Sequence, residues 1–136
     1  MAAYGDPTKP ITVLIVGDNA PIADLTLTVL SELGPSGITV GDVPAAVAYL
    51  NEFGPEVAAV VADGELDGEL TGVEFARFAR IAWPHLRVAV TTTTGTAQER
   101  RLAALADGIE RFTTPIMPLE VVTFLHDVSE RARQAA

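Results

Sequence analysis

The sequence predicts a doubly wound α/β fold, in which helices cover both faces of a five-stranded parallel sheet. Apolar runs alternate with helical patterns five times along the chain, and the runs at 13–16 and 57–62 are apolar throughout. Continuous apolar runs are typical of strands that are buried on both faces, as in parallel sheets. The alternation of strands and helices implies right-handed crossovers between parallel neighbours.

Glycine and proline mark the ends of most expected elements. The expected strands are 11–16, 37–40, 57–62, 87–91 and 109–113, and the expected helices are 20–33, 43–53, 72–82, 97–107 and 118–133. Proline is favoured in the first turn of a helix and glycine just after its end. The prolines in first turns are Pro21, Pro44 and Pro118, and the glycines at helix ends are Gly34, Gly54 and Gly108. Helix 97–107 begins at Thr96-Ala97-Gln98-Glu99, which has the form of a capping box.

Length and composition exclude several classes of protein. The 136 residues suffice for one domain with a core, which we assign to 10–133 after a polar N-terminal lead-in at 1–9. The net charge of −9 argues against direct nucleic-acid binding, and the absence of cysteine excludes disulfides and zinc-thiolate sites. We find no run near the roughly 18 apolar residues of a membrane span and no signal peptide, so we expect no membrane association and a cytoplasmic location.

The charges are unevenly distributed along the chain. Between Lys9 and Arg77 there is no basic residue, but eleven acidic residues lie there. The later half carries eight arginines, and Lys9 is the only lysine.

Acids and threonines follow the expected strands at the points where those strands end. Asp18 follows the first strand, Asp63 and Glu65 follow the third, and Thr91 and Thr114 lie at the ends of the fourth and fifth. In an open parallel sheet, ligands bind beyond the carboxyl ends of the strands. Two carboxylates there suit a hard cation such as Mg²⁺, a carboxylate can act as a nucleophile, and a hydroxyl can bond a phosphoryl oxygen. This set of groups suits phosphoryl chemistry.

Four segments in order resemble the receiver domain of bacterial two-component response regulators, over about residues 10–130. They are Val13 to Asn19, Val60-Val61-Ala62-Asp63 with Gly72 nine residues on, Val88-Ala89-Val90-Thr91-Thr92, and Thr114-Pro115-Ile116-Met117-Pro118-Leu119-Glu120. The resemblance implies a flavodoxin-like receiver fold with strand order 2-1-3-4-5, so that 10–133 would be the receiver domain.

The resemblance also implies roles for these residues. Asp63 would accept a phosphoryl group from a histidine kinase or phosphotransfer protein, and Thr91 would bond that group and move inward. Asp18 and Asp63 would bind Mg²⁺ through their side chains, and Glu65 through its backbone carbonyl. A protein of this kind is a signalling protein rather than an enzyme. A downstream effector protein and a second copy of the chain, as in a homodimer, are further candidate partners.

Four positions depart from the family pattern. Gly17 replaces the first acid of the pair, Thr114 replaces the usual lysine, Arg111 replaces an aromatic residue, and Asp67 replaces a proline. The lost contacts predict slow phosphorylation and weak Mg²⁺ binding, and Gly17→Asp is expected to tighten that binding because affinity follows ligand charge.

Two other functions remain open at the level of sequence. One is a phosphorylation-independent pseudo-receiver that acts as a protein-interaction module, and the other, ranked last, is a Mg²⁺-dependent phosphatase-like hydrolase. The pattern also leaves open whether the chain is a single-domain regulator or one module of a larger protein.

Several polar residues are expected to have ordinary structural roles. Glu65, Asp67 and Glu69 are interpreted as a solvated acidic loop, and Thr92 and Thr94 as strand residues that run into a polar loop. His85 is expected in a surface turn, His126 on the last helix without a catalytic partner, and Trp83 partly buried at the end of a helix. Asn19 is equally compatible with a helix cap and with a neighbour of the metal site. Leu27 lies off the core stripe of its helix, and is either an ordinary exposed leucine or a docking contact.

Overall fold

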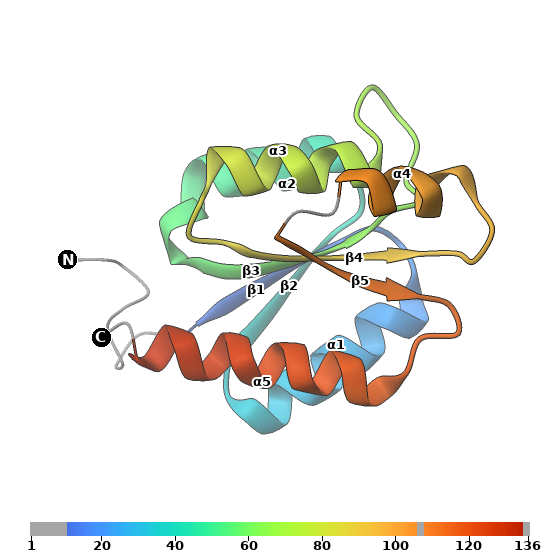
Figure 1. Ribbon diagram of the computed structural model, residues 1–136. Coiled ribbons are helices and arrows are strands. Elements are labelled where there is room, and N and C mark those ends of the chain that lie inside the picture. Colours follow the sequence, from blue (N-terminus) through green and yellow to red (C-terminus); the bar gives the residue numbers. More distant parts are fainter. Residues whose placement is uncertain (1–10, 106–107, 135–136) are drawn as a thin grey trace.

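The computed structural model describes residues 11–105 and 108–134, and it has a single parallel sheet between two layers of helices (Figure 1). The strand order is β2-β1-β3-β4-β5, and every neighbouring pair is parallel. Both the doubly wound class and the order 2-1-3-4-5 are therefore confirmed. The expected lead-in at 1–9 lies outside the described residues.

The elements lie close to their predicted positions. The strands are β1 (Thr12–Val16), β2 (Ser36–Val40), β3 (Val57–Asp63), β4 (Arg87–Thr92) and β5 (Ile109–Thr113). The helices are α1 (Ala20–Leu33), α2 (Val43–Phe53), α3 (Gly72–Ala82), α4 (Ala97–Leu105) and α5 (Pro118–Gln134), with a short 3₁₀ helix, η2 (Gly54–Glu56), after α2. The last two residues of the predicted helix 97–107 lie outside the described part of the chain.

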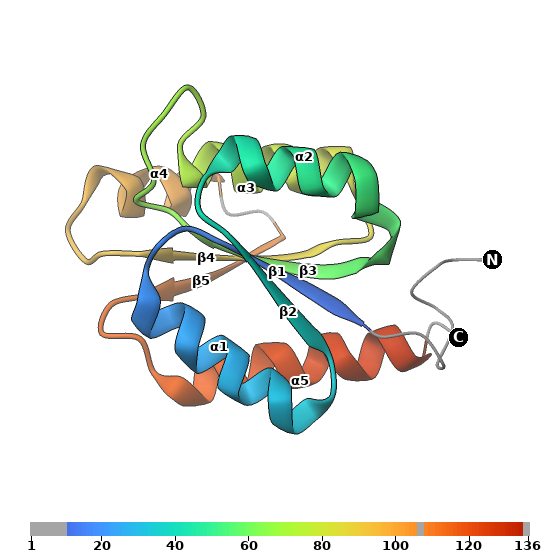
Figure 2. The same ribbon diagram turned by 180° about the vertical axis from the view of Figure 1, so that it is seen from behind.

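The sheet separates two apolar cores. Helices α2, α3 and α4 cover one face, and α1 and α5 cover the other (Figures 1 and 2). Val60 of β3 packs into the first core with Phe75 of α3, and Val61 packs into the second with Phe124 of α5. β3 is buried along its whole length up to the half-buried Asp63, as its continuous apolar run predicts.

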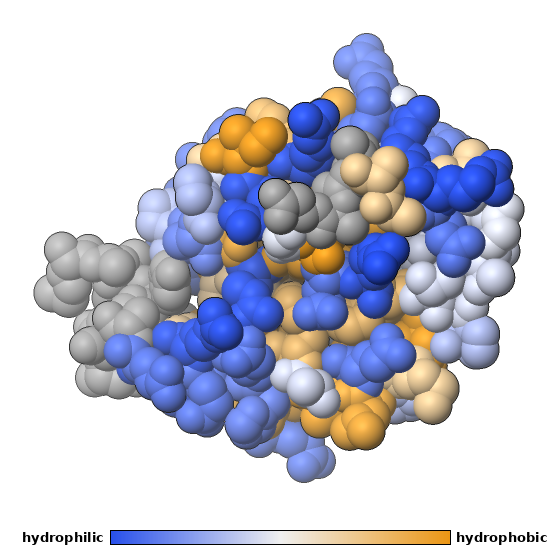
Figure 3. All heavy atoms as spheres, in the orientation of Figure 1, coloured by the Kyte–Doolittle hydropathy of each residue, from blue (hydrophilic) through white to orange (hydrophobic). Residues whose placement is uncertain are grey.

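The surface is mainly hydrophilic on the face shown in Figure 3. Hydrophobic atoms gather there at the lower edge, near the beginning of α5 (Figure 3). In the sequence, the exposed large apolar side chains just before and within the first turns of α5 are Met117, Leu119 and Val122. Within the described residues, no helix is both long enough and apolar enough to cross a bilayer.

Side-chain caps fix the beginnings of the helices. Asn19 Oδ1 accepts the N–H of Ile22 at 3.4 Å, so Asn19 is the cap of α1. A complete capping box, which we did not predict, begins α3, because Thr71 and Glu74 each accept the other's backbone N–H. The box predicted at 96–99 is incomplete: Thr96 Oγ1 accepts the N–H of Glu99, but the Glu99 carboxylate accepts the N–H of Gly95.

Candidate functional site

The candidate site lies where β1 and β3 end side by side, at the point where the strand order reverses. Asp63 is the last residue of β3 and is half-buried, while Asp18 follows β1 and is exposed. In the sheet register Asp63 pairs with Thr91 of β4, and Val16 at the end of β1 pairs with Ala62. The register therefore brings the two aspartates and Thr91 to one edge of the sheet.

The surroundings of Asp63 disfavour the negatively charged form of its carboxyl group. Burial raises the pKa of the Asp63 carboxyl above its usual range, and the nearby charges of Glu65 and Asp18 raise it further. The backbone N–H of Glu65, which donates to Asp63 Oδ1 at 2.9 Å, lowers this pKa and so offsets part of the effect. Asp18 acts on Asp63 because β1 and β3 are neighbours and both residues lie at the ends of these strands. We call the region beyond these strand ends the crevice.

The charges at the strand ends bear on the Mg²⁺ that the family resemblance implies. The ion pairs formed among the described residues join Arg87 and Arg131 to Asp127, Arg101 to Glu74, and Arg133 to Glu130. The acids of the crevice thus have no ion-pair partner there. Within the same residues no group of three His, Cys, Asp or Glu side chains could hold a metal ion. Two carboxylates and a backbone carbonyl are nevertheless suitable for Mg²⁺, which usually keeps several of its waters.

Gly17 occupies a backbone conformation that other residues rarely adopt. Its φ is 124°, and a Cβ built on it would stand 2.7 Å from the Cβ of Asp63. The expectation that Gly17→Asp tightens Mg²⁺ binding is therefore corrected, because an aspartate at this position meets both backbone strain and a clash with Asp63.

Thr91 presents an unsatisfied hydroxyl next to Asp63. Its exposed fraction is 3%, and its Oγ1 has no hydrogen-bond partner among the described residues. Leaving a buried hydroxyl without a hydrogen-bond partner costs free energy. The Thr91 hydroxyl is therefore available to bond a group bound at Asp63.

Glu65 connects two loops instead of lying in solvent, which corrects our interpretation of it. Its Oε2 accepts the backbone N–H of Thr93 at 3.0 Å and the hydroxyl of Thr96 at 2.8 Å. We call this arrangement of Glu65, Thr93 and Thr96 the Glu65 clasp. It ties the β3–α3 loop to the residues that precede α4. Asp67 and Glu69, by contrast, are exposed as expected.

Thr114 is engaged with the β4–α4 loop. Its Oγ1 accepts the N–H of Thr94 at 3.2 Å, and its carbonyl accepts the hydroxyl of Thr94. Thr94 is therefore more than a loop residue. Thr92 is buried in β4, where its hydroxyl lies 3.4 Å from that of Thr113. Thr92 is the last residue of β4 and runs into a loop, as expected. The hydrogen bonds between Thr94 and Thr114 were not predicted.

Arg111, at the position of the usual aromatic residue, is exposed on β5. His85 lies in the turn after α3, as expected. Its Nε2 also lies 3.0 Å from the carbonyl oxygen of Gly54 and 3.1 Å from that of Val57, so His85 links this turn to the beginning of β3. His126 is exposed, and Trp83 is half-buried against the first core, as expected. Leu27 has an exposed fraction of 36% and lies over Gly37 of β2, where a Cβ would clash with it. This packing gives Leu27 a structural role, and its role as a docking contact stays a prediction.

Comparison with solved structures identifies the fold of this chain, whereas comparison of sequences does not. No family model matches the chain, and no curated protein sequence matches it significantly. A solved protein from Neptuniibacter caesariensis matches 90% of this chain and 89% of its own, with TM-score 0.74 and 24% identity. A putative response regulator from Chloroflexus aurantiacus matches 90% of this chain and 100% of its own, with TM-score 0.72 and 22% identity.

The receiver domain of NtrX from Brucella abortus is also similar, with TM-score 0.69 and 26% identity over 91% of this chain and 99% of that domain. The chain has the fold of a response-regulator receiver domain. In a longer NtrX structure, the matching region covers only 28% of the NtrX chain. That match covers 91% of this chain but only part of the larger regulator.

Proposed function

We propose that this chain is a two-component receiver in which Asp63 accepts a phosphoryl group from a histidine kinase or phosphotransfer protein. The observation that carries the proposal is the register pairing of Asp63 with Thr91 at the strand ends, together with a buried Thr91 hydroxyl that has no hydrogen-bond partner within the described part of the chain. The proposal includes a downstream effector protein as the reader of the signal, and a cytoplasmic location.

The reaction requires a carboxylate nucleophile. An Asp63 oxygen attacks phosphorus, the phosphorus–nitrogen bond of the phosphohistidine breaks, and the histidine leaves with the bonding pair and takes up a proton. The Glu65 N–H holds Asp63 Oδ1 at 2.9 Å, which fixes the orientation of the carboxylate. The Thr91 hydroxyl can then donate to an oxygen of the transferred group.

Mg²⁺ would be held by the side chains of Asp18 and Asp63 and by the carbonyl of Glu65, where it supplies positive charge against the incoming phosphoryl oxygens. No lysine follows β5 to serve the same purpose, because Thr114 stands at that position. A lost charge-assisted contact costs roughly 1.5–3 kcal/mol, which corresponds to about a 10- to 150-fold slower reaction.

A pseudo-receiver is the second candidate function. It is favoured by the lack of an ion-pair partner for the crevice acids among the described residues, and by the engagement of Thr114 with Thr94. In that case the chain binds partner proteins without phosphorylation.

Intact-mass measurement after incubation with acetyl phosphate and Mg²⁺ distinguishes the two functions. Wild type is expected to gain one phosphoryl group, and Asp63→Asn is expected to gain none. Asp67→Asn is the matched control, since Asp67 is an exposed acid of the same loop, and it should behave as wild type. If wild type gains no phosphoryl group at high Mg²⁺ and long incubation, the pseudo-receiver is the better account.

A further inference from the structure

Helix α2 carries almost no charge on its outer side. Val43, Ala46 and Leu50 are its buried residues, and Glu52 is the only charged residue among its eleven. Surface helices usually carry charged side chains opposite their buried stripe. The outer side of α2 instead presents the exposed, uncharged residues Pro44, Ala48 and Asn51 at helical spacing. Beside them lies Val47, which is half-buried against the first core.

This side of α2 forms one wall of an open groove. The groove has a volume of about 560 Å³, and its other wall is the β3–α3 loop, residues 67–70. Figure 2 shows α2 at the front of its layer, with this loop rising beside the first turns of the helix. Leu70 adds an apolar side chain to the loop wall and has an exposed fraction of 37%. Small side chains along α2 would allow a second helix to approach its axis closely.

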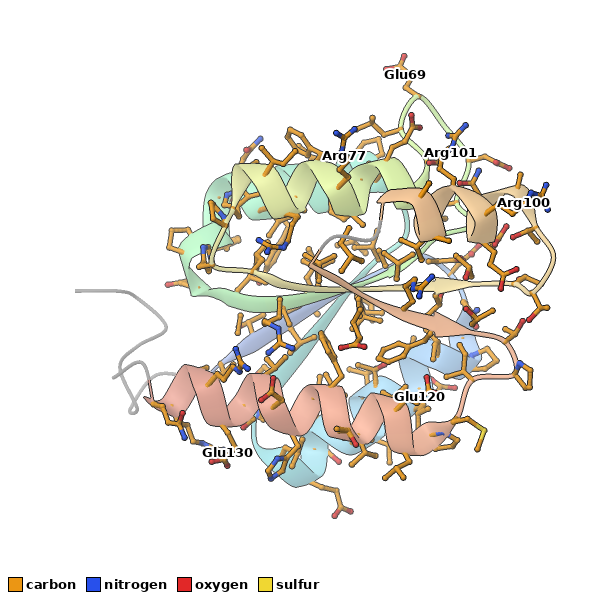
Figure 4. All side chains as sticks on the ribbon, in the orientation of Figure 1. Glu69, Arg77, Arg100, Arg101, Glu120 and Glu130 are labelled. Atoms are coloured by element: carbon orange, nitrogen blue, oxygen red, sulfur yellow. The ribbon has the colours of Figure 1, made fainter. Side chains whose placement is uncertain are left out.

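The rim of the groove is acidic. Asp67 and Glu69 line it and are exposed, and Glu69 lies at the tip of the loop and points away from the body of the domain (Figure 4). No basic residue occurs between Lys9 and Arg77, so no lysine or arginine comes from α2 or from this loop. Arg77 and Arg101 line a neighbouring groove between α3 and α4, which shares only Leu70 with this one.

We propose that the groove between α2 and the β3–α3 loop is a docking site for a basic amphipathic helix of a partner protein. The apolar side chains of such a helix would lie against Val47, Ala48 and Leu70, and its lysines or arginines would face Asp67 and Glu69. Helix-in-groove recognition of this kind relies on apolar anchors one turn apart, and charges at the rim set orientation and rate of association. The proposal goes beyond the phosphoacceptor function, because it needs neither Asp63 nor a phosphoryl group.

The test is an NMR-monitored titration of the full chain with a synthetic helical peptide of leucine and lysine, in which the leucines form one face. We expect chemical-shift changes that concentrate in α2 and in residues 66–70, and affinity that falls with added salt. The same peptide with glutamate in place of lysine should not bind. Asp63→Asn should bind like wild type, so the outcome is independent of phosphoryl transfer.

Variants at exposed positions test the groove directly. Asp67→Asn combined with Glu69→Gln is expected to weaken binding roughly 2- to 25-fold, and Ala48→Arg is expected to abolish it by filling the groove with a cation. Glu120→Gln, an exposed acid on α5 (Figure 4), is the control and should bind like wild type. Circular dichroism melts establish that the variants remain folded.

Several results would overturn the proposal. Shift changes outside the groove, equal binding of the glutamate peptide, or unchanged affinity in the groove variants would each do so. Self-association that perturbs the same residues without any peptide would also overturn it, because the occupant would then be a second copy of this chain, with Arg77 and Arg101 as the complementary charges.

Discussion

The Glu65 clasp makes a prediction whose size follows from two hydrogen bonds. Glu65→Ala removes the acceptor for the Thr93 N–H and for the Thr96 hydroxyl, which lie 3.0 and 2.8 Å from Oε2. A typical hydrogen bond contributes about 0.5–1.5 kcal/mol to stability, so the two together should contribute about 1–3 kcal/mol. We use this neutral range because Glu65 is half-exposed and its charge is screened by solvent.

A second substitution separates the hydrogen bonds from the charge. In Glu65→Gln the amide oxygen can still accept both bonds, and the repulsion that raises the pKa of Asp63 is removed. We therefore expect Glu65→Gln to be considerably less destabilised than Glu65→Ala. Glu69→Ala, in the same loop but exposed, is the control and should change the free energy of unfolding by less than about 0.5 kcal/mol.

The assay is urea unfolding, in which the variants are compared at the same m-value, together with hydrogen exchange of the Thr93 amide. Loss of the clasp should lower the urea midpoint and speed the exchange of this amide, because its acceptor is gone. If Glu65→Ala is as stable as Glu69→Ala, and the Thr93 amide exchanges at the wild-type rate, then the clasp is not formed in solution and our account of the β4–α4 loop is wrong.

Three further predictions concern the crevice. Gly17→Ala should destabilise the fold by about 1–3 kcal/mol, since the φ of Gly17 is 124°; a thermal melt at the wild-type midpoint would contradict the left-handed conformation. The pKa of Asp63 is raised in the folded protein, so its negative charge destabilises the fold at pH values above this folded pKa. The destabilisation decreases as the pH falls through the folded pKa, and it is absent below the pKa that Asp63 has in the unfolded chain. Asp63→Asn should therefore be more stable than wild type at neutral pH and converge with it in acid, which urea midpoints at several pH values will measure. Thr114→Lys should speed phosphorylation by roughly 10- to 150-fold, and an unchanged rate in a mass time course would show that position 114 does not face Asp63.

Local sequence patterns were sufficient to predict most of the fold. The apolar run from Val57 to Ala62 has no polar interruption, and such a run has few stable places other than the centre of a parallel sheet. Gly34 and Gly108 have φ of 104° and 76° at helix and loop ends, where glycine is the favoured residue. The placement of Asp63 and Thr91 at the same sheet edge follows from the lengths of their strands.

The contacts among loops could not be predicted in the same way. Glu65 and Thr93 are 28 residues apart, and nothing in the local sequence of either loop indicates that the other is its partner. Gly17 shows a different limit, because glycine is compatible with both signs of φ and its sequence position alone does not reveal which one it adopts. The engagement of Thr114 by Thr94 likewise depends on how two loops meet in space.

The central claim, that Asp63 is a phosphoacceptor, is tested most directly by intact mass after incubation with acetyl phosphate and Mg²⁺. Our account predicts the addition of one phosphoryl group to wild type, at a slow rate, and no addition to Asp63→Asn. Addition of a phosphoryl group to both proteins, or to neither, would contradict it.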